Sequence, residues 1–216
     1  GILSTRLEGF EFRPQQVDMA AAVAEAFGNA KHLIVEAGTG TGKSLAYLIP
    51  AILWAVENNK KVVISTYTKT LQHQILNHDI PFLRDKLGIA FRYALCMGNE
   101  NYLSLRRLKR SAQAGLFTKS DEENQWDGIF NWAEETETGF RSHLPFEVLP
   151  QVWEEVGRQK DLCLGKSCET HSSCFYFKAR KKWFGAHLLI VNHHLFFANI
   201  ANAGAVLPAF DAVVFD

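Results

Sequence analysis

The sequence has no net charge, no apolar run of membrane length and no secretion signal. Lys and Arg together number 23, as do Asp and Glu, so the formal net charge is zero and no global field attracts a polyanion. No apolar run approaches the ~20 residues that span a bilayer, and the N-terminus lacks a basic-then-apolar pattern. We therefore expect a soluble intracellular protein without membrane contact, on which any nucleic-acid surface is local.

Internal repeats and low-complexity segments are also lacking. The 216 residues, 47% of them hydrophobic, suffice for one core, or for a core with a small insertion. Apolar strands are expected over about 32–36, 61–66 and 90–95, and helices over 15–27, 43–57 and 69–76. Strands that alternate with helices predict an α/β fold, in which helices cover both faces of a parallel sheet.

This alternation stops near residue 97. Charged, polar and aromatic residues then mix, three of the four cysteines cluster, and the apolar strands Leu188–Val191 and Ala212–Phe215 follow. The sequence therefore predicts a domain formed by residues 1–96 and 183–216, interrupted by an insertion over 97–182.

The strongest chemical signal is the run from Glu36 to Ser44, which lies between an apolar strand and an apolar helix. Its residues Gly38, Thr39, Gly40, Thr41 and Gly42 read as a phosphate-binding loop. Glycines let backbone N–H groups turn toward an anion, the following lysine reaches the outer phosphates, and the hydroxyl after it suits Mg²⁺. Lys43 and Ser44 fill those two positions, although Ala37 replaces the first glycine of the strict pattern. We therefore predict binding of a nucleoside triphosphate with Mg²⁺.

Further motifs occur in a fixed order around this loop. They are Phe12-Arg-Pro-Gln-Gln16, the loop itself, Val62–Gln74, Gly98-Asn-Glu-Asn-Tyr-Leu103, three spaced cysteines, Val191-Asn-His-His-Leu195 and Val213-Val-Phe-Asp216. In that order they resemble the superfamily 2 DNA helicases of the XPD/DinG group, and more closely the bacterial DinG-like branch. The resemblance implies a RecA-like P-loop motor domain interrupted by an iron–sulfur-type insertion.

The resemblance also implies roles for single residues. Arg13 and Gln16 match the adenine-recognition motif, Lys43 matches the catalytic phosphate contact, and Asp216 matches the first residue of the DEAH box, which anchors Mg²⁺. The water-activating glutamate and a second motor domain would follow Asp216. We therefore expect an N-terminal fragment, inactive alone, of a monomeric, nucleoid-associated helicase that moves 5′-to-3′ on single-stranded DNA and acts on duplexes or forks, with a role in DNA repair.

Two further groups of residues are expected to contact DNA. Ser65, Thr66, Thr68 and Lys69 match the family motif that grips the nucleic-acid backbone, and they follow a strand, where ligands of open sheets bind. Lys178, Arg180, Lys181 and Lys182 are interleaved with aromatic residues, as in single-strand-binding surfaces. The neighbouring His193 and His194 are expected to be structural and not catalytic.

The cysteines leave three interpretations open. Cys163, Cys168 and Cys174 match the last three ligands of the family's [4Fe–4S] cluster, but Ser104 occupies the position of the first. Cys96 could supply the fourth thiolate, although a buried cysteine at a strand end is also expected there. Alternatively His171 completes a zinc site with the three thiolates, or no metal binds.

A second class of function competes with the helicase. The phosphate loop and a metal-binding insertion are also compatible with a P-loop kinase or metabolic NTPase whose insertion holds zinc. That alternative does not account for the adenine motif or for the residues after the second strand. Single-stranded DNA would stimulate ATP hydrolysis only in the helicase.

Overall fold

The computed structural model describes residues 12–38, 42–114 and 120–216. The chain divides into two compact units, one of residues 1–96 with 183–216 and one of residues 97–182. Within the described ranges, no helix has both the length and the apolar character needed to cross a membrane.

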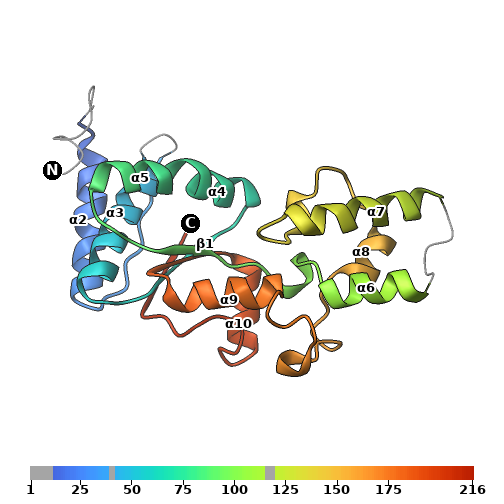
Figure 1. Cartoon of the computed structure of the whole chain (residues 1–216). Helices are drawn as coiled ribbons and strands as arrows, with labels where there is room; N and C mark the ends of the chain where they lie inside the picture. Colours follow the sequence, from blue (N-terminus) through green and yellow to red (C-terminus); the bar gives the residue numbers. More distant parts are fainter. Residues whose placement is uncertain (1–11, 39–41, 115–119) are drawn as a thin grey trace. The chain divides into compact units, whose positions relative to one another are not determined.

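The first unit is built on a four-stranded parallel sheet (Figure 1). Its strands are β1 (Val62–Thr66), β2 (Tyr93–Leu95), β3 (Leu188–Asn192) and β4 (Ala212–Phe215), in the spatial order β2-β3-β1-β4. In the centre of the sheet Ile64 lies opposite Ile190 of β3 on one side and Val214 of β4 on the other. The predicted α/β class with a parallel sheet is confirmed.

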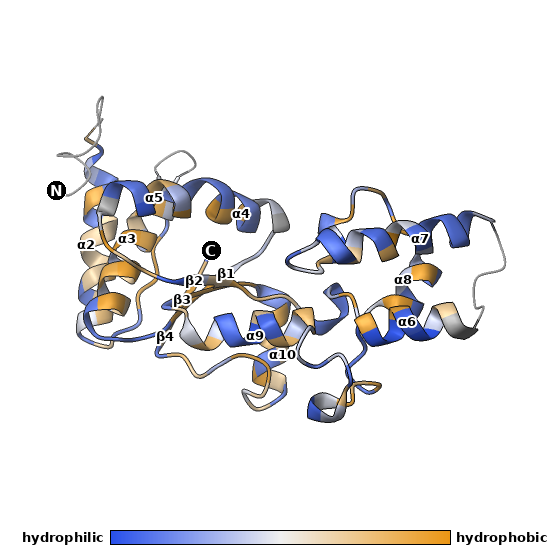
Figure 2. Cartoon of the chain, in the orientation of Figure 1, coloured by the Kyte–Doolittle hydropathy of each residue, from blue (hydrophilic) through white to orange (hydrophobic). Residues whose placement is uncertain are grey.

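Helices pack on both faces of this sheet. They are α2 (Pro14–Gly28), α3 (Lys43–Glu57), α4 (Lys69–Gln74), α5 (Ile80–Leu87) and α10 (His193–Ala201). Side chains alternate between the two faces of a strand, and Val62 and Ile64 of β1 join the main apolar core with α2, α3 and α5. Helix α10 contacts β1 and β3. Apolar residues line the inner sides of α2 and α3 in Figure 2, as expected for helices that cover a sheet.

The helix boundaries follow from local chemistry. Helix α2 begins at Pro14, whose fixed φ suits the first turn, and α3 begins after Gly42, which has a φ of +76°. Thr68 accepts a hydrogen bond from the backbone N–H of Leu71 (3.1 Å) and so caps α4. The helices predicted over 15–27 and 43–57 are therefore confirmed.

The third predicted helix continues further than expected. After α4 the chain forms a π-helical turn, Ile75–Asp79, and then α5. The π turn ends shortly before Pro81, which lacks the N–H of a regular helical ladder. The prediction of 69–76 identified the start of this segment and missed its extension.

The strand predicted over 32–36 is wrong. Residues 31–38 form no regular secondary structure, and the side chain of Ile34 is 98% exposed. A strand needs a neighbour that offers backbone donors and acceptors, and no described strand pairs with this segment. Apolar composition alone therefore did not produce a strand at this position.

The second unit is mainly helical. It contains α6 (Leu105–Ala114), α7 (Ser120–Glu135) and α8 (Pro150–Val156), with short 3₁₀ turns at Asn99–Asn101, Arg141–His143 and Gly165–Ser167. Helix α9 (Phe175–Gly185) starts in this unit and ends in the first. Isolated bridges join Tyr102 to Phe140 and Leu103 to Gly157, and these buried positions form part of the unit's apolar interior.

Candidate nucleotide site and cysteine cavity

The predicted adenine motif lies against the phosphate loop. The amide Nε2 of Gln16 donates to the carbonyl oxygen of Gly42 at 3.0 Å, although 26 positions separate these residues. Arg13 is exposed at the start of α2, where its carbonyl accepts from the N–H of Gln16 at 3.0 Å. The structure thus brings Gln16 to the loop by a direct contact and places Arg13 one turn away.

Lys43 occupies the first position of α3. Its ammonium donates to the carbonyl oxygens of Ala37 (2.9 Å) and Gly38 (3.0 Å). The lysine therefore bridges the two ends of the loop, with its cation turned toward the loop backbone. Thr39, Gly40 and Thr41 lie outside the described residues.

Asp216 meets α3 through a tyrosine that the sequence interpretation missed. The hydroxyl of Tyr47 donates to Oδ2 of Asp216 at 2.6 Å, and Tyr47 is 3% exposed. Burial and the Asp216 carboxylate raise the pKa of Tyr47 well above its usual value, while a side-chain hydrogen bond with Ser44 has the opposite effect. Residues three apart in a helix share a face, so the spacing of Ser44 and Tyr47 could have indicated from the sequence that Tyr47 lies near the nucleotide site.

Asp79 is a second acidic group in this region. It closes the π-helical turn, and its Oδ2 atom is buried without a hydrogen-bond partner in the described part of the chain. Burial raises the pKa of this carboxyl, and the negative charge of Asp216 acts in the same direction. The sequence analysis did not single out Asp79, which is close enough to Asp216 for their charges to interact.

The residues predicted to grip DNA follow β1. Ser65 and Thr66 are fully buried. The hydroxyl of Thr66 lies 3.4 Å from the carbonyl oxygen of Thr68 and 3.4 Å from that of Val191. Thr68 is exposed and caps α4, while the side chain of Lys69 lies outside the described residues. Of this group, Thr68 is therefore the described side chain most open to a ligand.

Ser65 contacts one of the paired histidines. Its Oγ lies 2.7 Å from Nδ1 of His193, whose ring also packs against the rings of Tyr67 (5.9 Å between centroids) and Phe215 (5.7 Å). His194 is exposed. His193 thus connects the end of β1 to the end of β4, a packing role consistent with the expected structural function.

The three clustered cysteines line one cavity of the second unit. Cys163, Cys168 and Cys174 share it with Ser104 and His171. No set of three or more His, Cys, Asp or Glu side chains in the described ranges is arranged to hold a metal ion. Cys96 belongs to the first unit, where it is buried at the end of β2. The cavity thus gathers Ser104, His171 and the three clustered cysteines, but its lining does not include Cys96 and its donors are not in ligating geometry.

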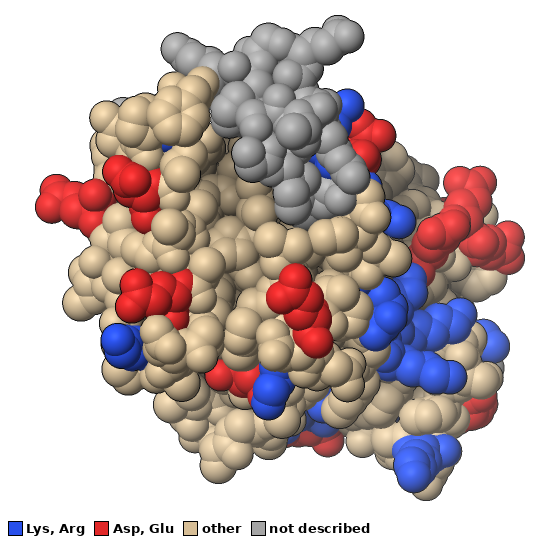
Figure 3. Space-filling model, turned by 90° about the vertical axis from the view of Figure 1, so that its left-hand side faces the viewer, with Lys and Arg blue, Asp and Glu red and all other residues tan. Residues whose placement is uncertain are grey.

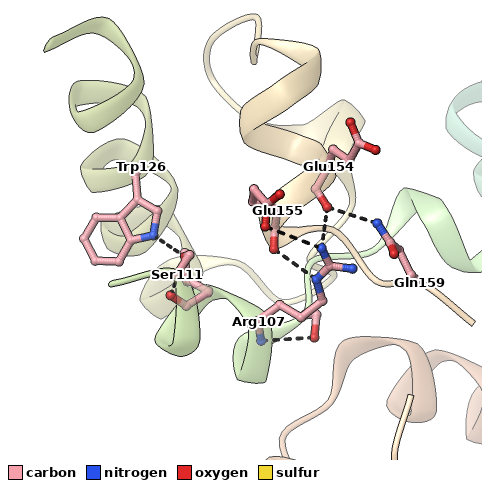
Figure 4. A network of polar contacts seen from close by, with 8 residues as sticks. Arg107, Ser111, Trp126, Glu154, Glu155 and Gln159 are labelled. Atoms are coloured by element: carbon pink, nitrogen blue, oxygen red, sulfur yellow. Dashed lines mark hydrogen bonds and ion pairs between the residues drawn. The ribbon is translucent and has the colours of Figure 1, made fainter. Parts of the chain in front are cut away.

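Two half-buried arginines, Arg107 and Arg158, also line this cavity. Arg107 donates from Nε and Nη2 to the carbonyl oxygens of Glu155 (3.0 Å) and Glu154 (2.6 Å), and Figure 4 shows its third nitrogen pointing away from both. That Nη1 atom and the Nε atom of Arg158 are buried without hydrogen-bond partners among the described residues. The cavity that contains the three thiols is thus also lined by two guanidinium groups, a cationic lining that suits an anionic occupant.

The predicted basic surface lies on α9. Lys178, Lys181 and Lys182 are exposed, whereas Arg180 lies with Nη1 3.5 Å from the hydroxyl of Tyr176. On the face in Figure 3, Lys and Arg side chains gather in one region although the chain is neutral overall. Three exposed lysines thus lie on α9, and their contact with nucleic acid stays a prediction.

Comparison with known proteins places this geometry in a family. Residues 14–124 match the DEAD/DEAH box helicase family. The chain is 36% identical to the ATP-dependent DNA helicase YoaA of Haemophilus influenzae, covering 100% of the chain and 34% of that protein. It is 37% identical to the ATP-dependent helicase DinG of Mycobacterium tuberculosis H37Rv, covering 97% of the chain and 34% of the relative.

A further relative is named differently. The chain is 31% identical to the 3′-5′ exonuclease DinG of Bacillus subtilis, covering 99% of the chain and 23% of that protein. The chain thus spans about a third, or less, of the length of these curated relatives. The matched family region contains Gln16, Lys43 and Ser44. The chain belongs to the DEAD/DEAH box helicase family, and its similarity over nearly its full length is to DinG and YoaA proteins.

Proposed function

We propose that this chain is the ATP-binding part of an ATP-dependent DNA helicase. The observation that carries the proposal is that Gln16 contacts the phosphate loop while Asp216 hydrogen-bonds to the helix after that loop. The residues proposed for adenine recognition, phosphate binding and Mg²⁺ binding thus belong to one unit. Relatives named as helicases favour this function over a P-loop kinase with a zinc-binding insertion.

The proposed nucleotide site assigns a task to each side chain. Gln16, with Arg13 nearby, reads the adenine edge, because an amide offers one donor and one acceptor in fixed geometry. Lys43 leaves the loop carbonyls and contacts the outer phosphates when ATP enters. Ser44 and Asp216 hold Mg²⁺, and the positive end of the α3 dipole faces the phosphates.

The proposed DNA path begins where β1 ends. Hydroxyl and backbone groups at Ser65, Thr66 and Thr68, with Lys69, contact phosphates without reading the sequence. The cations of α9 at Lys178, Arg180, Lys181 and Lys182 bind the single strand elsewhere. In this proposal residues 1–96 and 183–216 form the motor domain, and hydrolysis moves it 5′-to-3′ along one strand toward a duplex or fork.

The second unit is proposed as an iron–sulfur-type insertion. Cys163, Cys168 and Cys174 would hold a [4Fe–4S] cluster. Ser104, at the family position of the fourth ligand, lines the same cavity. The unused donors of Arg107 and Arg158 fit such an anionic group. When bound, a cluster of this kind supplies a redox-active cross-link between distant segments. The alternative zinc site would use His171 in place of the serine.

Residues 1–216 alone are not expected to unwind DNA. We propose that the parent protein supplies the water-activating acid and a second motor domain after Asp216, which accords with curated relatives about three times as long. The active form is proposed to be a monomer of the whole parent protein. It would work in the bacterial cytoplasm, at the nucleoid, in DNA repair.

The test is ATP hydrolysis by the parent protein with and without single-stranded DNA. DNA should stimulate the rate, and Lys43→Ala should abolish it by removing the cation on the outer phosphates. Lys31→Ala, in an exposed pair with Glu25 at 3.7 Å, serves as the control and should hydrolyse normally. A rate that DNA does not change would refute the helicase proposal.

A further inference from the structure

Tyr47 is the residue through which Asp216 contacts the phosphate-loop helix. Its hydroxyl donates to Oδ2 of Asp216 at 2.6 Å, and its ring is buried in the core between α3 and the sheet. A short O–H···O⁻ bond of this kind is among the stronger hydrogen bonds in proteins. The aspartate therefore has one oxygen occupied by the tyrosine.

The backbone of Asp216 is fixed as well. Its N–H donates to the carbonyl oxygen of Ser65 at 2.9 Å, and its own carbonyl accepts from the N–H of Tyr67 at 3.0 Å. These bonds extend the β1–β4 ladder by one residue. The remaining freedom of Asp216 is rotation of its side chain about χ1 and χ2, and the Tyr47 hydroxyl restricts this motion.

We propose that Tyr47 is a positioning residue that selects which oxygen of Asp216 faces Mg²⁺. The inference rests on the proposed role of Asp216 as a Mg²⁺ anchor. Mg²⁺ requires near-octahedral geometry with short ligand distances, so a carboxylate that rotates freely binds it poorly. With Oδ2 held by Tyr47, Oδ1 is the oxygen that remains for the ion or for its bound water.

The position of Tyr47 in α3 supports this role. It lies three residues after Ser44, the other proposed Mg²⁺ ligand, and so shares a helix face with it. One rigid helix thus sets both the Ser44 hydroxyl and the orientation of the Asp216 carboxylate. Groups that orient a metal ligand in this way commonly change metal affinity by 10- to 100-fold when removed, on the order-of-magnitude scale.

The test is Tyr47→Phe in the full-length parent protein, which removes the hydroxyl and keeps the buried ring. Mn²⁺, a spectroscopic substitute for Mg²⁺, is titrated in the presence of ATP and followed by electron paramagnetic resonance. Half-saturation should require about tenfold more Mn²⁺ in the variant. The matched control is Tyr93→Phe in β2, at the opposite edge of the sheet from β4, which should titrate like the wild type.

A double variant checks that Tyr47 acts through the aspartate. The effect of Tyr47→Phe should disappear in an Asp216→Asn background, because the carboxylate to be oriented is absent. If Tyr47→Phe lost its melting transition, Asp216→Glu would be used instead, since it keeps the tyrosine and displaces the carboxylate. It should likewise weaken Mn²⁺ binding.

Two results would overturn the inference. One is equal Mn²⁺ half-saturation in the wild type and Tyr47→Phe, and the other is an undiminished effect of Tyr47→Phe in the Asp216→Asn background. Failure of the helicase proposal looks different, because it appears as ATP hydrolysis that DNA does not stimulate. The Mn²⁺ titration needs neither DNA nor turnover, so the two failures are distinguishable.

Discussion

Gln16 and Gly42 are joined by a hydrogen bond of 3.0 Å from the side-chain amide of the first residue to the carbonyl oxygen of the second. The bond connects α2 to Gly42, the residue that directly precedes α3. It leaves the amide oxygen of Gln16 free of this contact, so an approaching base edge finds an acceptor at a fixed place beside the phosphate loop. This geometry predicts how the two residues respond to substitution.

Replacing Gln16 by alanine should weaken the recognition of adenine. We expect the KM for ATP to rise about tenfold, because an uncompensated polar contact costs on the order of 1–2 kcal/mol. The preference for ATP over GTP should fall in parallel. Steady-state hydrolysis by the parent protein measures both, with Gln15→Ala, an exposed neighbour on α2, as the control. An unchanged ATP preference in Gln16→Ala would remove the adenine-reading role.

Gly42→Ala should destabilise the chain. Gly42 has a φ of +76°, where an alanine costs about 1–2 kcal/mol, and an added Cβ would clash with Nε2 of Gln16. Gly28→Ala is the matched control, since its Cβ would meet nothing within 4 Å. Thermal unfolding should show a lower midpoint for Gly42→Ala and an equal or higher one for Gly28→Ala. Equal midpoints for the two variants would contradict the strained geometry.

The main features of the motor fold were predictable because its signals are local. The Pro14 start of α2 and the glycine before α3 identify helix ends, and the apolar β1 and β3 are buried on both faces as parallel strands must be. The segment Leu33–Val35 has the same apolar character and forms no strand. Strand pairing depends on a partner strand that is distant in the sequence, and local composition does not reveal whether such a partner is present.

The details of the site were less predictable for a related reason. Tyr47 resembles any apolar core residue of α3, and only its 2.6 Å contact with Asp216, 169 positions away, distinguishes it. Lys43 donates to the Ala37 and Gly38 carbonyls, a contact that the sequence did not indicate, and its role at the phosphates stays a prediction. The Lys43 side chain is half-buried, and the loop carbonyls satisfy its ammonium donors.

Asp79→Asn should stabilise the chain at neutral pH. Burial raises the pKa of Asp79, so the folded state disfavours the ionised carboxyl, and the wild type loses stability as the pH rises from the unfolded-state value of about 3.9 through the raised folded-state pKa. Asp79→Asn has no carboxyl to ionise at this position, so it does not lose stability in this way as the pH rises. Its melting midpoint should exceed that of the wild type at pH 7, and the difference should shrink toward pH ~3.5.

The control for this titration is Asp85→Asn, an exposed residue of α5. Its melting midpoint should differ little from that of the wild type at either pH. If Asp79→Asn were less stable than the wild type at pH 7, the carboxylate would have a partner that outweighs its burial. That outcome would contradict the direction of the pKa shift.

His193→Ala should lower stability, whereas His194→Ala should not. His193 lies 2.7 Å from the buried Ser65 hydroxyl and packs against aromatic rings, and loss of such contacts costs about 1–3 kcal/mol. His194 is exposed, so its replacement should change the free energy of unfolding by no more than about 0.5 kcal/mol. Thermal unfolding compares the pair. Similar midpoints in both variants would show that the Ser65 contact contributes nothing.

Ser104→Cys should strengthen cluster binding by the second unit. Ser104 lines the cavity that contains Cys163, Cys168 and Cys174, and the substitution gives the four thiolates that normally hold a [4Fe–4S] cluster. After anaerobic reconstitution with iron and sulfide, the variant should hold more iron per chain than the wild type and show a stronger broad band near ~400 nm. Ser142→Cys, exposed in the same unit and outside the cavity, adds a thiol without this effect. If Ser104→Cys bound zinc with no gain in iron, a zinc site would replace the cluster, because the donors of the cavity would then favour a single tetrahedral ion.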